Sequence, residues 1–204
     1  MSMVLRGLAA FFLSAVLATF AQNAVLSRAL GVSRLIKLVG DGGGFLRFVG
    51  LLTLIQLICV PMAWYANSLL AGFALRGAVR PLVMVLTSGG AMGLVWLVLV
   101  RAIKTKPAWL PEVLELLPLA TFNCAVLGTL LITVTQGYTL VQSFGFALGS
   151  GLGYAMALAV AGQAQEMLQG PDVPSSFRGL PITLVYLGIL ALAIYGFTGH
   201  MVVI

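Results

Sequence analysis

The sequence predicts an all-α, polytopic membrane protein with almost nothing outside the bilayer. Of its 204 residues, 61% are hydrophobic and 8% are charged, and the mean hydropathy is +1.11. The charge-free runs are long: residues 7–27, 48–75, 81–100, 116–165 and 179–199. A soluble domain carries about 25% charged residues, and a chain of this size cannot bury so much apolar surface. These observations exclude a soluble enzyme, a nucleic-acid-binding protein and a disordered chain.

Six transmembrane helices follow from these runs. A spanning helix needs roughly 20 apolar residues, so four of the runs hold one span each. The longest run holds two, because Thr135, Gln136, Gly137 and Tyr138 form a polar, turn-like break within it. The predicted spans are residues 5–26, 48–70, 81–100, 114–134, 143–164 and 180–199. A cleavable signal peptide is the alternative for the first span, and its apolar run is longer than such signals have.

The basic residues orient the chain. Eight of the eleven lie in the connections between spans 1 and 2, 3 and 4, and 5 and 6: Arg28, Arg34, Lys37, Arg47, Arg101, Lys104, Lys106 and Arg178. Short loops rich in Lys and Arg stay in the cytoplasm. We therefore expect both termini to lie outside, and we interpret the net charge of +6 as topology and contact with anionic lipid.

Two segments of the chain resemble each other. Asn23 is followed by Ala24, Val25 and Leu26, and Asn123 is followed by Cys124, Ala125, Val126 and Leu127, one hundred residues later. Each segment begins a three-span half, and an odd number of spans inverts the second half relative to the first. We predict one membrane domain, residues 1–204, built from inverted repeats over about 1–102 and 110–204, with interrupted first and fourth helices.

The polar side chains within the spans are few. Asn23 and Asn123 either bond between packed helices or brace helix breaks near the membrane midplane. A second small set either lines a polar path or satisfies packing: Gln56, Asn67, Gln136 and Gln142. No acid lies deep in a span, which argues against a self-sufficient proton antiporter. Gly145, Gly149 and Gly153 form an i, i+4 stripe that favours close helix packing.

The sequence resembles a known family, the six-span Rnf/Nqr membrane subunits of the RnfA/NqrE type. The resemblance rests on the string from Thr121 to Gly128 in the fourth span, the string from Asp172 to Gly179, and Gly196-Phe197-Thr198-Gly199. The first half matches more loosely, through Asn23 and Leu30-Gly31-Val32-Ser33. The resemblance implies a membrane component of a complex that couples electron transfer, between ferredoxin or NADH and another carrier such as quinone, to Na⁺ or H⁺ translocation in the bacterial inner membrane.

The resemblance also implies a partner and a cofactor. Family members pair with a homologous subunit of opposite orientation, and the pair holds a [2Fe–2S] cluster at the interface, with two cysteines from each. Here only Cys124 matches a ligand position, because the Cys-Pro string of the first half is missing. Cys59 lies in the second span, where the family has no ligand. Three possibilities remain: Cys124 joins a cluster completed by other thiolates, the scaffold lacks the cluster, or Cys124 only packs.

The sequence therefore predicts a subunit that is not catalytic alone. The rival interpretations are a stand-alone transporter or channel on the same inverted repeat, and a redox-silent scaffold subunit.

Overall fold

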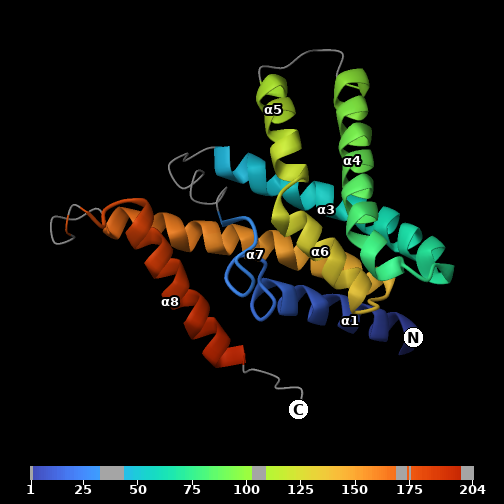
Figure 1. The fold of residues 1–204 in the computed structure, drawn as a ribbon, viewed down its shortest axis with the longest axis horizontal. Coiled ribbons are helices and arrows are strands. Elements are labelled where there is room, and N and C mark those ends of the chain that lie inside the picture. The colour runs from blue at the N-terminus through green and yellow to red at the C-terminus, as the bar shows by residue number, and fades with distance from the viewer. Residues whose placement is uncertain (1, 33–43, 103–108, 169–173, 175, 199–204) are drawn as a thin grey trace.

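The computed structural model of the chain describes residues 2–32, 44–102, 109–168, 174 and 176–198, and these ranges contain helices and turns but no strand. The all-α prediction is confirmed. The elements in chain order are α1 (Ser2–Thr19), α3 (Gly44–Leu69), the short 3₁₀ helix η1 (Leu70–Gly72), α4 (Arg76–Ala102), α5 (Leu110–Thr121), α6 (Cys124–Thr135), α7 (Leu140–Met167) and α8 (Leu180–Thr198) (Figure 1).

The helices follow the predicted spans, with one difference. Three described stretches are long and apolar enough to cross a membrane alone: Gly44–Gly72, Arg76–Arg101 and Leu140–Met167. Helices α5 and α6 make a fourth as a broken pair bent by 48°, while Val4–Thr19 and Leu180–Gly196 are shorter apolar helices. The first span was expected to run over residues 5–26 with an interruption, and the helix itself ends earlier, at Thr19, because the following backbone bonds to a side chain, as described below. The count of six spans and the inverted repeat stay predictions.

Helix α7 lies at the centre of the molecule (Figure 1). It contacts α1, α3, α6 and α8. Most of its inward face is glycine, alanine or serine, so neighbouring backbones approach it closely. The core around it is completed by large side chains with no exposed surface: Phe48, Leu52 and Ile55 of α3, Leu130 of α6 and Tyr154 of α7.

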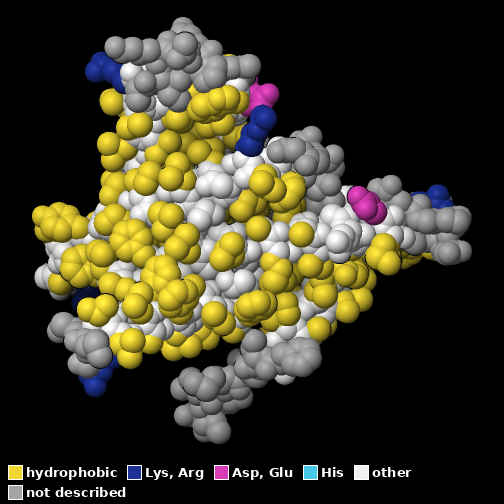
Figure 2. Space-filling model, turned by 180° about the vertical axis from the view of Figure 1, so that it is seen from behind, with side chains coloured by type: hydrophobic (Ala, Val, Ile, Leu, Met, Phe, Trp, Pro, Cys, Tyr) yellow, Lys and Arg dark blue, Asp and Glu magenta, His cyan; other side chains and the backbone are white. Residues whose placement is uncertain are grey.

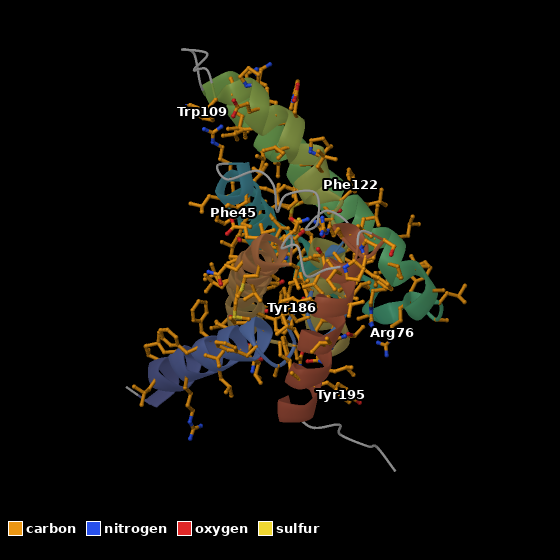
Figure 3. All side chains as sticks on the ribbon, turned by 90° about the vertical axis from the view of Figure 1, so that its left-hand side faces the viewer. Phe45, Arg76, Trp109, Phe122, Tyr186 and Tyr195 are labelled. Atoms are coloured by element: carbon orange, nitrogen blue, oxygen red, sulfur yellow. The ribbon has the colours of Figure 1, made fainter. Side chains whose placement is uncertain are left out.

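Helices α4 and α5 stand side by side as a pair that projects from this core, and α8 slants away from it (Figure 1). In Figure 3, Trp109 and Phe122 mark the two ends of α5. An exposed ion pair between Arg47 and Glu112 ties the first turn of α5 to the first turns of α3.

The surface is largely apolar. Figure 2 shows hydrophobic side chains over most of the visible face and charged side chains only near its edges. Because a soluble protein rarely exposes a continuous apolar surface of this extent, the surface is that of a multi-pass membrane protein.

Candidate functional site

The fourth span is broken at Phe122 and Asn123. Asn123 has an extended backbone, with φ −70° and ψ 135°, and it is the N-cap of α6. Its Oδ1 accepts a hydrogen bond from the Ala125 N–H at 2.9 Å. Asn is among the preferred N-cap residues because its short side chain satisfies N–H groups that the first turn leaves unpaired. The break therefore follows from the residue type, and it lies where the sequence predicts an interruption.

The first span is interrupted in a similar way at Asn23. Its Oδ1 accepts from the Val25 and Leu26 N–H groups at 2.9 and 3.1 Å. Its Nδ2 donates to the Thr19 carbonyl at 2.8 Å and to the Gly153 carbonyl at 3.0 Å. Asn23 has no exposed surface. Both the oxygen and the nitrogen of its side-chain amide are therefore hydrogen-bonded within the protein interior. The segment after Thr19 turns because this side chain supplies the bonds that a continuing helix would have made.

Helix α7 joins the two breaks. Asn23 bonds to the carbonyl of Gly153, and Asn123 donates through Nδ2 to the hydroxyl of the next residue, Tyr154, at 3.4 Å. The Tyr154 hydroxyl in turn donates to the Gly31 carbonyl at 3.1 Å. One turn of α7 thus holds both interrupted segments, and sequence reasoning missed Tyr154 because an aromatic residue in an apolar span shows no sign of a hydrogen-bonding role.

Gly31 fits into this contact because it has no side chain. Its φ is +78°, and a Cβ at that position would lie 2.5 Å from Asn123 Oδ1 and 3.0 Å from the Tyr154 ring. Both the left-handed backbone and the lack of space require glycine. The segment after the first break therefore lies directly against the second break.

The glycine stripe of α7 lies against α1. A Cβ on Gly145 would overlap the Phe11 carbonyl, one on Gly149 would overlap the Ala15 backbone, and one on Gly153 would lie 2.7 Å from Asn23 Nδ2. The Thr19 hydroxyl also donates to the Gly149 carbonyl at 3.1 Å. The two backbones touch along this stripe, and this close approach places Asn23 within reach of α7.

Cys124 is the first residue of α6, directly after the N-cap, and it is exposed. Cys59 is fully buried in α3. In the part of the chain that the structure describes, no three His, Cys, Asp or Glu residues gather in a metal-binding group. A [2Fe–2S] cluster takes four thiolates, or two with two histidines. The described residues do not fit a complete cluster, since they offer one exposed thiol.

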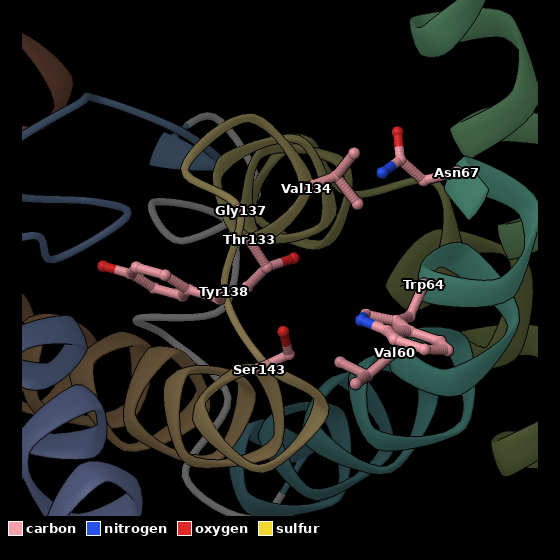
Figure 4. A pocket seen from close by; sticks show the side chains of 8 residues that line it. All are labelled: Val60, Trp64, Asn67, Thr133, Val134, Gly137, Tyr138 and Ser143. Carbon is pink, nitrogen blue, oxygen red and sulfur yellow. The ribbon is translucent and has the colours of Figure 1, made fainter. Parts of the chain in front are cut away.

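A second polar region lies between α3, α6 and α7, and it includes Gln56 and Asn67 from the sequence analysis. Gln56 has no exposed surface and its amide nitrogen bonds to Thr129 and Ser150. Asn67 lines a hollow of about 140 Å³ with Thr133 and Ser143 (Figure 4). Sequence reasoning missed the four hydroxyl side chains because single Ser and Thr residues in apolar helices ordinarily bond to their own backbone.

The chain is similar to membrane proteins of bacterial redox complexes. It is 44% identical over 96 residues to a subunit of the ion-translocating oxidoreductase complex of Syntrophotalea carbinolica, covering 47% of this chain and 50% of that protein. The match to the same subunit of the Pasteurella multocida complex is 41% identical over 96 residues, with the same shares. A subunit of the Na⁺-translocating NADH-quinone reductase of Shewanella denitrificans is 40% identical over 83 residues, 41% of each chain.

The chain spans about half the length of the curated relatives it matches. The family profile described as Rnf-Nqr subunit, membrane protein, covers more: it matches residues 11–201. That range includes both interrupted segments, the glycine stripe and Cys124. The chain belongs to the Rnf-Nqr family of membrane-protein subunits.

Proposed function

We propose that this chain is a membrane subunit of an Rnf/Nqr-like complex that couples electron transfer to the translocation of Na⁺ or H⁺. The observation that carries the proposal is the family match over residues 11–201. The names of the relatives support the same role, since they belong to an ion-translocating oxidoreductase complex and to a Na⁺-translocating NADH-quinone reductase.

The contribution of this chain is structural and electrostatic. Two interrupted segments lie inside the apolar bundle at Asn23 and Asn123, and each asparagine oxygen accepts from N–H groups of the turn that follows it. In hydrocarbon, every such backbone group needs a partner. The asparagines therefore stabilise interrupted helices within the apolar bundle, where unpaired backbone groups would otherwise be costly.

The proposed partners are the other subunits of such a complex, with an oppositely oriented homologous subunit beside this one. The exposed Cys124 at the helix break is available to a neighbouring subunit. As a cluster ligand it would need three more thiolates from elsewhere. The proposed location is the bacterial inner membrane with both termini outside, as the positions of the basic residues favour.

A redox-silent scaffold subunit is the second candidate. The single exposed thiol among the described residues favours it. In that case the complex keeps this chain for its broken helices and its ion path, and the electrons pass elsewhere.

The proposal is tested by isolating the tagged chain with the subunits that co-purify from its native membrane. We expect flavoprotein and ferredoxin-like subunits in the preparation, and electron-driven Na⁺ or H⁺ uptake when the preparation is reconstituted in vesicles. Purification of the chain as a homodimer that carries solute without an electron donor would refute it and support the stand-alone transporter. Iron content with Cys124→Ala beside wild type separates the two candidates: a loss of iron assigns Cys124 as a ligand.

A further inference from the structure

A buried polar cluster links the three central helices. Gln56 of α3, Thr129 of α6 and Ser150 of α7 are each at most 2% exposed. The Gln56 Nε2 donates to Thr129 Oγ1 and to Ser150 Oγ, both at 3.3 Å, and the two hydroxyl oxygens lie 2.8 Å apart. Gln56 Oε1 is buried and has no hydrogen-bond partner among the residues that the structure describes.

Counting donors and acceptors shows what the cluster lacks. Thr129 donates its only hydroxyl hydrogen to the Ala125 carbonyl at 2.8 Å, so Ser150 is the donor between the two hydroxyls. The amide hydrogens of Gln56 are both used. The opposite amide orientation would leave both of those hydrogens without an acceptor, and buried orphan N–H groups are rarer than orphan carbonyls. The open positions are therefore lone pairs only, on Gln56 Oε1 and Ser150 Oγ.

Lone pairs without free donors do not suit an anion. They suit a hard cation, because hard cations bind amide and hydroxyl oxygens in preference to soft ligands. The three side chains are neutral, so they hold such an ion weakly. Weak binding is what a path needs, because an ion that enters a site must also leave it.

A hollow lies on the same three helices, toward the end of α3. It is lined by Asn67 of α3, Thr133 of α6 and Ser143 of α7, with Trp64 and Tyr138 beside them (Figure 4). Thr133 is one turn from Thr129, ~6 Å along α6, and Ser143 is about two turns, ~10 Å, from Ser150 along α7. Hydroxyl side chains of the hollow and of the cluster are thus one to two turns apart on α6 and α7, and the hollow lies on the side that the basic residues predict to face outside.

We infer that Gln56, Thr129 and Ser150 form part of a binding site for a partly dehydrated monovalent cation of the Na⁺ class, reached through the hollow between α3, α6 and α7. The inference rests on the proposed ion-translocating function and gives it a place within this chain. Gln56 Oε1 and Ser150 Oγ are the ligand atoms, and Thr129 orients Ser150 by accepting its hydrogen.

Equilibrium binding of ²²Na⁺ to the purified full chain in detergent, with choline as the other cation, tests the site. Wild type is expected to show saturable binding. Gln56→Met keeps the side-chain length but removes both polar atoms, and we expect its Kd to rise about tenfold or more. The matched control is Gln163→Met, since Gln163 lies on α7 and is exposed. Its binding is expected to equal that of wild type.

Ser150→Ala is the second variant and removes one ligand atom with little change in volume. It keeps the test open if Gln56→Met does not fold, and we expect its Kd to rise as well. The absence of saturable ²²Na⁺ binding by wild type, or equal binding by the Gln56 and Gln163 variants, would overturn the inference.

The binding assay needs no partner subunit. Suppose that the complex pumps ions but that Gln56 binds no ²²Na⁺, either in the chain alone or within the complex. This result would refute the site and leave the proposed function standing. A chain that binds ²²Na⁺ through Gln56 but co-purifies with no redox subunit would refute the function and keep the site.

Discussion

Replacing Gly149 by alanine is expected to destabilise the protein by forcing α1 away from α7. The new Cβ would overlap the backbone of Ala15, which has no flexible side chain that could move aside. Overpacking of this kind costs about 1–3 kcal/mol, and contact with backbone places Gly149 at the upper end of that range. Alanine regains roughly 0.5–1 kcal/mol of helix propensity, so the expected net loss is about 1–2.5 kcal/mol.

The measurement is thermal unfolding of the purified chain in detergent, followed by circular dichroism. For a chain of this length, 1 kcal/mol corresponds to about 2–4 °C in Tm, so the expected fall is about 2–10 °C. Gly93→Ala is the matched control, because Gly93 lies within α4 and a Cβ there meets nothing within 4 Å. Its Tm is expected to stay level or rise. If the two alanine variants have the same Tm, the close contact between α1 and α7 does not contribute to stability and the reasoning fails.

Three further substitutions test the breaks and the turn between α6 and α7. Asn123→Ala removes the N-cap of α6, which costs about 0.5–2 kcal/mol, so its Tm should fall below that of Asn67→Ala; equal values would exclude a capping role. Gly31→Ala should lower Tm because the backbone is left-handed and Asn123 Oδ1 fills the space, and protease accessibility of the segment after α1 should increase; an unchanged digestion pattern would contradict this. Burial raises the pKa of Tyr138, so the folded chain favours the neutral phenol and loses stability as the pH rises above the unfolded pKa of about 10. Tyr138→Phe should therefore reduce the fall in Tm at alkaline pH, and identical alkaline profiles would show that Tyr138 has no such effect.

The sequence was sufficient to predict those parts of the fold that depend on local composition. Apolar runs placed the helices, and Asn123 within an otherwise apolar run placed the break between α5 and α6. An interruption of the first helix near Asn23 was also predicted, but its exact position, with α1 ending at Thr19, was not, because no proline or glycine marks it and the bond from Asn23 to Gly153 joins residues 130 apart.

The polar cluster was only half predictable for a similar reason. Gln56 is conspicuous in an apolar helix, whereas Thr129 and Ser150 look like ordinary hydroxyl residues that bond to their own helix. Their proximity depends on the packing of α3, α6 and α7 against one another. Spacing along one chain does not contain that information.

Tyr154 and Gly153 have a mechanical consequence for the whole molecule. Because the two interrupted segments are anchored to adjacent residues of one helix, a slide or rotation of that turn of α7 pulls on both anchors at once. The two interrupted segments cannot then be displaced one at a time. If a partner subunit displaces either break, the other break should move with it in a single concerted step.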